Sequence, residues 1–274
     1  MPKAITGDPQ ASRVSLPQVV IRATVAALVC GGGGVVWLAA SHSQWLPLFF
    51  AVPGRLIVIA LNLAGLGLSL AARRQFSRSE PLGVVWSLVA LAAACHLAGG
   101  VLWQMEGAGW QRLRLVLAGP VQTLLLAAGL AVALRIYRRS GLQGRPRFAD
   151  WLPMGVAAGF TVWAIYDLLL AGPATFEGAV VLVDIPLLGL LLIEAILVRR
   201  YSLRMGGGLI AQCWGAFTAA ILVSFVGDVA VWLFAHSPVP VPLTATSWYV
   251  WFLASAAYAL APAYQVEACR RASI

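Results

Sequence analysis

Ionisable side chains inside long apolar stretches are the residues of this 274-residue sequence that could do chemistry. They are Arg55, Asp167, Asp184, Glu194 and Asp228. Burying one such charge in a bilayer costs about 3 kcal/mol on insertion scales, so these residues typically serve a ligand site, an ion path or a buried ion pair. Three uncharged polar residues accompany them in the same stretches: Asn62, His96 and Gln122.

These residues fall into two groups according to their expected depth in the membrane. Arg55, His96 and the three aspartates all fall in the outer third of the predicted spans. An arginine and three aspartates on four helices cannot all face lipid cheaply, so we expect them to meet in a polar pocket open to the outer side. The alternative is that Arg55 and one aspartate form a buried pair that only fixes helix packing. Glu194 lies near the inner end, where we expect it to pair with Arg199 or Arg200.

Two tryptophans suggest which ligand such a pocket would suit. Trp163 lies one turn before Asp167, and Trp232 lies one turn after Asp228. A carboxylate beside an indole suits a cation with an apolar body. Tryptophan is also enriched at membrane interfaces, which would explain both residues without a ligand.

Several kinds of site are excluded or disfavoured. The only lysine is Lys3, so no span carries a retinal Schiff base, and His96 alone gives no bis-histidine haem site. No CxxC, GxSxG or HExxH motif occurs, so neither a metal site nor a hydrolase is indicated. The aspartates could act as general acid and base, which leaves a lipid-modifying enzyme as a third option. No cofactor is identified.

Composition sets the class of protein. Hydrophobic residues make up 61% of the chain and charged residues 11%, against about 25% charged in soluble domains. This excludes a soluble enzyme, a disordered chain and a nucleic-acid-binding module, so nucleic acid is not an expected partner. We expect an all-α integral membrane bundle in contact with the lipid bilayer.

Eight stretches reach the roughly 20 apolar residues that a membrane-spanning helix needs. They do not alternate as barrel strands do, so helices are predicted. The predicted spans are 22–41, 47–72, 82–103, 115–136, 151–171, 179–198, 209–234 and 247–266. Residues 1–20 form an N-terminal arm and 21–274 a single transmembrane domain.

Loop charge predicts the orientation. Sixteen basic residues fall on one side of the predicted bundle, against Arg112 and Arg114 on the other. The positive-inside rule therefore puts both termini in the cytoplasm. The N-terminus also resembles a signal peptide, but we expect a retained first helix. An Ala, Leu and Arg bias with almost no Lys suggests a bacterial inner membrane.

The arginine clusters recur after every second predicted helix, which suggests four repeated helical hairpins. The alternative is that any eight-helix protein shows alternating loops with positive inner ends. The glycine run 31–34 permits close helix packing, or a hinge in a broken helix.

The pairing of 227-GD-228 near one outer helix end with an RR dipeptide closing the next helix resembles the multi-helix sensor modules of bacterial signalling proteins. The resemblance covers mainly residues 150–271, and the chain stops soon after Arg271, where such modules usually continue into an output domain. It implies a sensing or scaffold module that acts through a membrane partner. We therefore expect a non-enzymatic protein that binds a small ligand or partner at the outer polar cluster, with a solute or cation transporter as the alternative.

Overall fold

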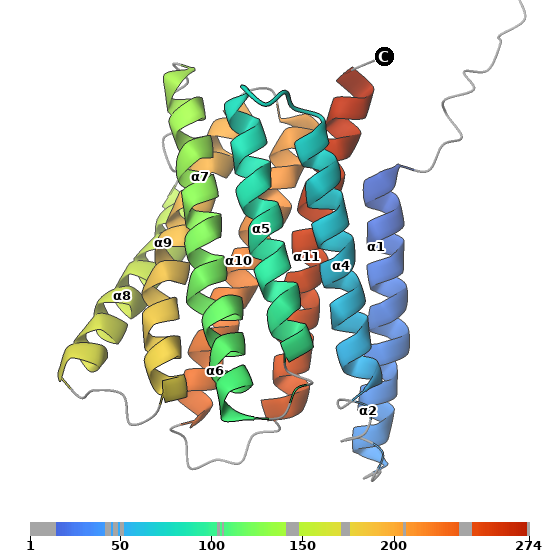
Figure 1. Cartoon of the computed structure of the whole chain (residues 1–274), viewed down its shortest axis with the longest axis vertical. Helices are drawn as coiled ribbons and strands as arrows, with labels where there is room; N and C mark the ends of the chain where they lie inside the picture. The colour runs from blue at the N-terminus through green and yellow to red at the C-terminus, as the bar shows by residue number, and fades with distance from the viewer. Residues whose placement is uncertain are drawn as a thin grey trace, which may run out of the picture.

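The protein is an up-and-down bundle of helices in a computed structural model (Figure 1). The structure describes residues 15–41, 45, 49, 52–102, 105, 107–140, 148–170, 176–204, 207–235 and 243–272. All regular secondary structure in those ranges is helical. The single helices are α4 (Pro53–Arg74), α5 (Pro81–Leu102), α8 (Phe148–Leu170), α9 (Phe176–Arg204), α10 (Gly208–Ala235) and α11 (Leu243–Ala272).

Two further crossings are composite helices. The first joins α1 (Leu16–Ala27), the π-helical turn η1 (Leu28–Gly32) and α2 (Gly33–Ala40). The second joins α6 (Ala108–Val116), the π-helical turn η2 (Leu117–Val121) and α7 (Gln122–Arg139). A proline inside a helix removes one backbone hydrogen bond and produces a kink. Accordingly, η2 contains Pro120 and bends at Gly119, whose φ and ψ are −106° and −110°.

Within the described ranges, seven helical segments are long and apolar enough to span a membrane, so the chain is a multi-pass membrane protein. They are Leu16–Trp37, Pro53–Arg74, Pro81–Leu102, Ala108–Arg139, Phe148–Asp167, Gly178–Arg204 and Gly208–Ala230. The predicted eighth span, 247–266, lies in α11, which is outside this set. Its sequence is rich in Trp, Tyr and Ser, and many of its residues pack inside the bundle. The presence of eight membrane-spanning helices therefore stays a prediction.

The centre of the bundle is formed by α9, α10 and α11, and α7 packs against α9. Helix α4 packs on α5 and α11, whereas α1 packs mainly on α11 and α8 mainly on α9. Figure 1 shows α1 and α8 at opposite sides of the bundle. The neighbours of each helix decide which of the predicted polar residues can meet.

The glycine run in the first crossing is a packing feature. A Cβ on Gly31 would lie 3.3 Å from the Trp248 ring, and one on Gly32 would lie 3.2 Å from the Tyr249 hydroxyl. The Tyr249 hydroxyl donates to the Gly32 carbonyl at 3.0 Å. Gly33 has open space around it, so only part of the run is needed for close approach.

One end of the bundle carries the arginines that close α4, α7, α9 and α11, and we call it the arginine-rich end. There Arg200 on α9 donates two hydrogen bonds to Asp150 near the start of α8. The expected pairing of Glu194 with Arg199 or Arg200 is therefore wrong. The ion pairs among the described residues do not include Glu194, because Asp150 from the neighbouring helix takes the Arg200 guanidinium.

Candidate functional site: a carboxylate pair in the bundle core

Two of the predicted aspartates lie together in the core of the bundle. Asp184 on α9 and Asp228 on α10 are close enough to interact electrostatically. Asp184 is 7% exposed, and its Oδ1 atom is buried with no hydrogen-bond partner among the described residues. An unpaired buried carboxylate oxygen is costly. The pair is therefore the strongest candidate for a ligand site in the described part of the chain.

Hydroxyl groups from three helices surround the pair. Thr123 at the start of α7 lies within hydrogen-bonding range of Asp184, and its hydroxyl also donates to the Gly119 carbonyl at 3.1 Å. Tyr258 on α11 lies near Ser224 on α10 and near both carboxylates. Each hydroxyl can donate a hydrogen bond to a carboxylate or offer an oxygen to a cation. The two carboxylates and three hydroxyls are called the carboxylate cluster below.

The kink in η2 brings the backbone at Gly119 close to Asp184 of the carboxylate cluster. A Cβ on Gly119 would lie 3.3 Å from Asp184 Oδ2 and 3.6 Å from Val180 Cγ1. Glycine therefore lets η2 approach the carboxylate closely. Kinked and π-helical turns often occur at functional sites, because they leave carbonyl oxygens outside the regular helical ladder.

His96 lies on the α5 side of the same region. Its Nδ1 is 2.7 Å from Gln122 Oε1, and its ring centroid is 6.0 Å from that of Trp251 on α11. Gln122 precedes Thr123 of the carboxylate cluster. His96 thus links α5 to the start of α7 through Gln122, and the contacts of the described residues do not join it to either aspartate.

The other predicted members are not joined to the pair. The ion pairs found among the described residues do not link Arg55 to any of the three aspartates. Arg55 is on α4, which packs on α5 and α11, and Asp167 is on α8, which packs on α9. Trp163 packs against Phe160 in a T-shaped arrangement at 6.0 Å. The side chain of Trp232 lies outside the described residues.

A compact apolar layer separates the pair from the arginine-rich end. Its members come from α7, α9 and α10 and are each at most 4% exposed: Leu130, Leu188, Leu191, Trp214, Phe217 and Ile221. The Trp214 indole donates to the Tyr137 hydroxyl at 2.8 Å. A polar path past Asn62 and Gln212 would indicate transport, but Gln212 points out of the bundle. The described core is therefore closed on this side of the cluster.

Sequence reasoning missed Thr123, Ser224, Tyr258 and Gly119. Single hydroxyls in a span carry no strong signal, because Ser and Thr commonly bond to their own helix backbone. The Gly-Pro dipeptide 119–120 inside an apolar stretch was the one usable signal, since it predicts a kink.

Within the described residues, no three His, Cys, Asp or Glu side chains are grouped so that they could hold a metal ion. Comparison with protein-family models, curated proteins and solved structures found no match. The resemblance to bacterial sensor modules stays a prediction.

Proposed function

We propose that the protein is a non-enzymatic sensing or scaffold module of a bacterial inner membrane that binds a small cation at Asp184 and Asp228. The proposal includes eight spans, cytoplasmic termini and a site that faces the outer side. The observation that carries it is the carboxylate pair, in which Asp184 is buried, Asp228 is half-buried, and Asp184 Oδ1 has no partner among the described residues.

Electrostatics favours a positively charged ligand. Two ionised carboxylates that interact inside a bundle repel each other, and the repulsion is stronger there than in water because the effective dielectric constant is lower. The ion pairs of the described residues leave both aspartates without an arginine or lysine partner. A bound proton or cation relieves the repulsion and the cost of burial together.

The donor atoms favour a small, hard cation. Carboxylates and hydroxyls offer oxygen atoms, which suit such ions. Kinked helices in transport proteins offer backbone carbonyls to Na⁺ in a similar way. The Gly119 carbonyl accepts a hydrogen bond from Thr123 of the carboxylate cluster, so the kinked turn and the cluster are linked. A cation here would contact α7, α9, α10 and α11, so its binding would bias how these helices pack.

The apolar layer favours binding over transport. A transporter needs a polar route to both sides, whereas Leu188, Phe217 and Ile221 are almost fully buried between the pair and the arginine-rich end. A lipid-modifying enzyme would need its acids in a cleft open to lipid, and Asp184 is 7% exposed. A cation transporter remains the second candidate, and the proposed experiment also separates the two.

The test is thermal unfolding of the protein in detergent micelles, followed by the fluorescence of its 11 tryptophans. Chloride salts of Na⁺, K⁺ and tetramethylammonium are compared with N-methylglucamine chloride at constant ionic strength. A ligand at about 100 times its Kd stabilises the folded state by about 2.7 kcal/mol. We expect Na⁺ or K⁺, but not the larger tetramethylammonium, to raise the unfolding midpoint of the wild type.

Asp184→Asn and Asp228→Asn should each abolish that increase, because each removes one of the two charges. Asp167→Asn is the matched control, since it makes the same change on α8 and should leave the increase intact. Equal midpoints in all salts, or an equal increase in Asp228→Asn, would refute the proposal. Uptake of the cation into proteoliposomes would favour the transporter instead.

A further inference from the structure

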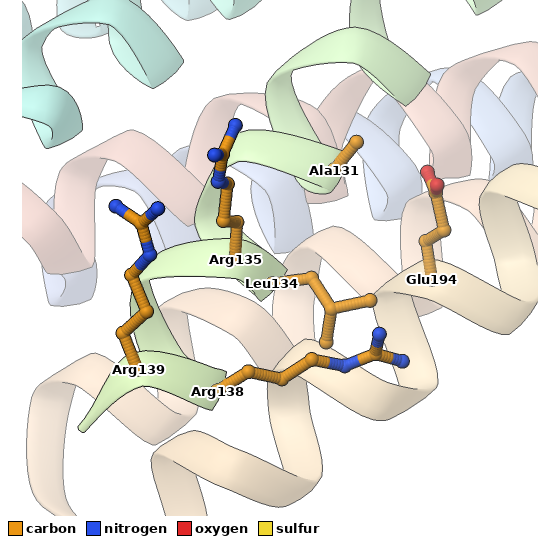
Figure 2. Close-up of a pocket in the computed structure, with 6 residues that line it drawn as sticks. All are labelled: Ala131, Leu134, Arg135, Arg138, Arg139 and Glu194. Atoms are coloured by element: carbon orange, nitrogen blue, oxygen red, sulfur yellow. The ribbon is translucent and has the colours of Figure 1, made fainter. Parts of the chain in front are cut away.

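A second polar site lies between α7 and α9 near the arginine-rich end. A cavity of about 430 Å³ there is lined by Ala131, Leu134, Arg135, Arg138, Arg139 and Glu194 (Figure 2). It is separate from the carboxylate cluster, and nothing in the proposed function uses it.

The three arginines share one face of α7. Their spacing of three and four residues puts them on adjacent turns on the same side of the helix. All three are exposed, and Ala131, one turn earlier on the same face, is exposed as well. Figure 2 shows Arg138 extending past Leu134 toward α9. The cavity thus combines guanidinium groups with an apolar wall at a helix end.

Glu194 supplies an acceptor on the opposite wall. Its Oε2 atom is buried and has no hydrogen-bond partner among the described residues. The nearby Arg200 is engaged with Asp150, and the ion pairs of the described residues leave Glu194 outside them. The cavity therefore offers several donors for an anion and one carboxylate for a cation, on facing helices.

We propose that this cavity binds the headgroup of a phospholipid that carries both a phosphate diester and a primary ammonium group. The arginines hold the phosphate through charge-assisted hydrogen bonds, and Glu194 accepts from the ammonium. Basic pockets between helices at this level of a membrane are known sites for lipid headgroups. The acyl chains follow the exposed apolar face of α7 at Ala131.

Hydrogen-bond donors and charge distinguish this headgroup from those of other phospholipids. Phosphatidylcholine offers the same phosphate, but its quaternary ammonium cannot donate a hydrogen bond to Glu194. Phosphatidylglycerol offers hydroxyl donors and adds no positive charge to meet the carboxylate. The ammonium of phosphatidylethanolamine supplies both the donor and the charge.

The test is native mass spectrometry of the delipidated protein in detergent, with equimolar phosphatidylethanolamine, phosphatidylcholine and phosphatidylglycerol of identical acyl chains. We expect the wild type to retain phosphatidylethanolamine about tenfold more than phosphatidylcholine, the typical value of one charge-assisted hydrogen bond. Equal retention of these two lipids, or preferred retention of phosphatidylglycerol, would overturn the proposal.

Two variants test separately which side chain binds the ammonium group and which binds the phosphate. Glu194→Gln should bring phosphatidylethanolamine down to the level of phosphatidylcholine, and Arg138→Gln should lower the retention of both. Arg74→Gln is the matched control, because Arg74 is an exposed arginine at the same end of the bundle and outside the cavity. An unchanged lipid preference in Glu194→Gln, or an equal loss in Arg74→Gln, would refute the assignment. The wild-type comparison stands even if a variant fails to fold.

Discussion

Replacing Glu267 by Gln should loosen the attachment of α1 to the rest of the bundle. Glu267 lies near the end of α11, just past the predicted eighth span, and is 1% exposed. Its Oε1 accepts hydrogen bonds from Arg271 Nε at 2.9 Å and from Arg270 Nη2 at 3.0 Å. The backbone N–H of Leu16, the first residue of α1, lies close enough to favour the charged form of the carboxylate. One carboxylate therefore ties the start of α1 to the end of α11.

The size of the effect follows from these contacts. The side chains of Arg270 and Arg271 are 50% and 60% exposed, so each pair is screened by solvent and contributes about 0.3–0.5 kcal/mol. A carboxylate at a helix N-terminus contributes about 0.3–1 kcal/mol, and up to about 2 kcal/mol when partly buried. Glutamine keeps the shape and removes the charge. We expect Glu267→Gln to lower the free energy of unfolding by about 1–3 kcal/mol at pH 7.

The effect should depend on pH. Burial opposes ionisation of Glu267, but the hydrogen bonds from Arg271 and Arg270 and the nearby backbone N–H of Leu16 outweigh it, so the pKa of this carboxyl lies below its usual value. A group whose pKa is lower in the folded state stabilises the protein above the pKa of the unfolded state, about 4.3 for Glu. That stabilisation disappears as the pH falls through the folded-state pKa.

The assay is thermal unfolding of the wild type and Glu267→Gln in micelles at pH 7 and at low pH, combined with hydrogen exchange of the α1 amides. The wild type should be more stable at pH 7, the difference should shrink at low pH, and exchange in α1 should be faster in the variant. Glu80→Gln, at an exposed position between α4 and α5, is the matched control. A difference that is the same at both pH values would refute the reasoning.

Three further substitutions test the core. Tyr137→Phe leaves the buried Trp214 N–H without its acceptor and should cost about 1–3 kcal/mol in chemical unfolding; no loss would show that the bond adds nothing. Gly189→Val on α9 places side-chain atoms against Thr161 on α8 and should lower the free energy of unfolding by about 1–3 kcal/mol. An unchanged unfolding midpoint would mean that α8 can move away from α9 without loss of stability. Gly119→Val should weaken the response to cations more than it lowers stability, and an intact response would argue against a role for the kink.

Depth in the membrane could be predicted from the sequence, but the neighbours of each helix could not. Asp184 and Asp228 were expected at similar depths, and they meet because α9 and α10 are adjacent. Arg55 was expected at the same depth, but α4 packs on α5 and α11. Asp167 was also expected there, and although α8 packs on α9, Asp167 does not join the pair. Similar depth and helix adjacency are therefore both necessary for contact, and the direction in which each side chain points decides the rest.

The predicted spans fall on the observed helices, but the predicted ends differ from the observed ends. The stretch 47–72 corresponds to α4, which begins at Pro53, a residue type favoured in the first turn of a helix. The stretch 247–266 lies within the longer α11, whose polar and aromatic residues are accommodated by packing rather than by lipid. The apolar pattern therefore located this helix but not its full length.

The position of α8 at the edge of the bundle has an evolutionary consequence. Helix α8 packs mainly on α9, and Ala157 and Ala164 are fully buried in it. Exposed positions such as Leu152, Val162 and Leu169 need only an apolar side chain. In homologous proteins, positions on the outer face of α8 should therefore vary among aliphatic residues, and the positions of the two alanines should keep small residues. Where the outer face instead stays invariant across species, another protein covers it.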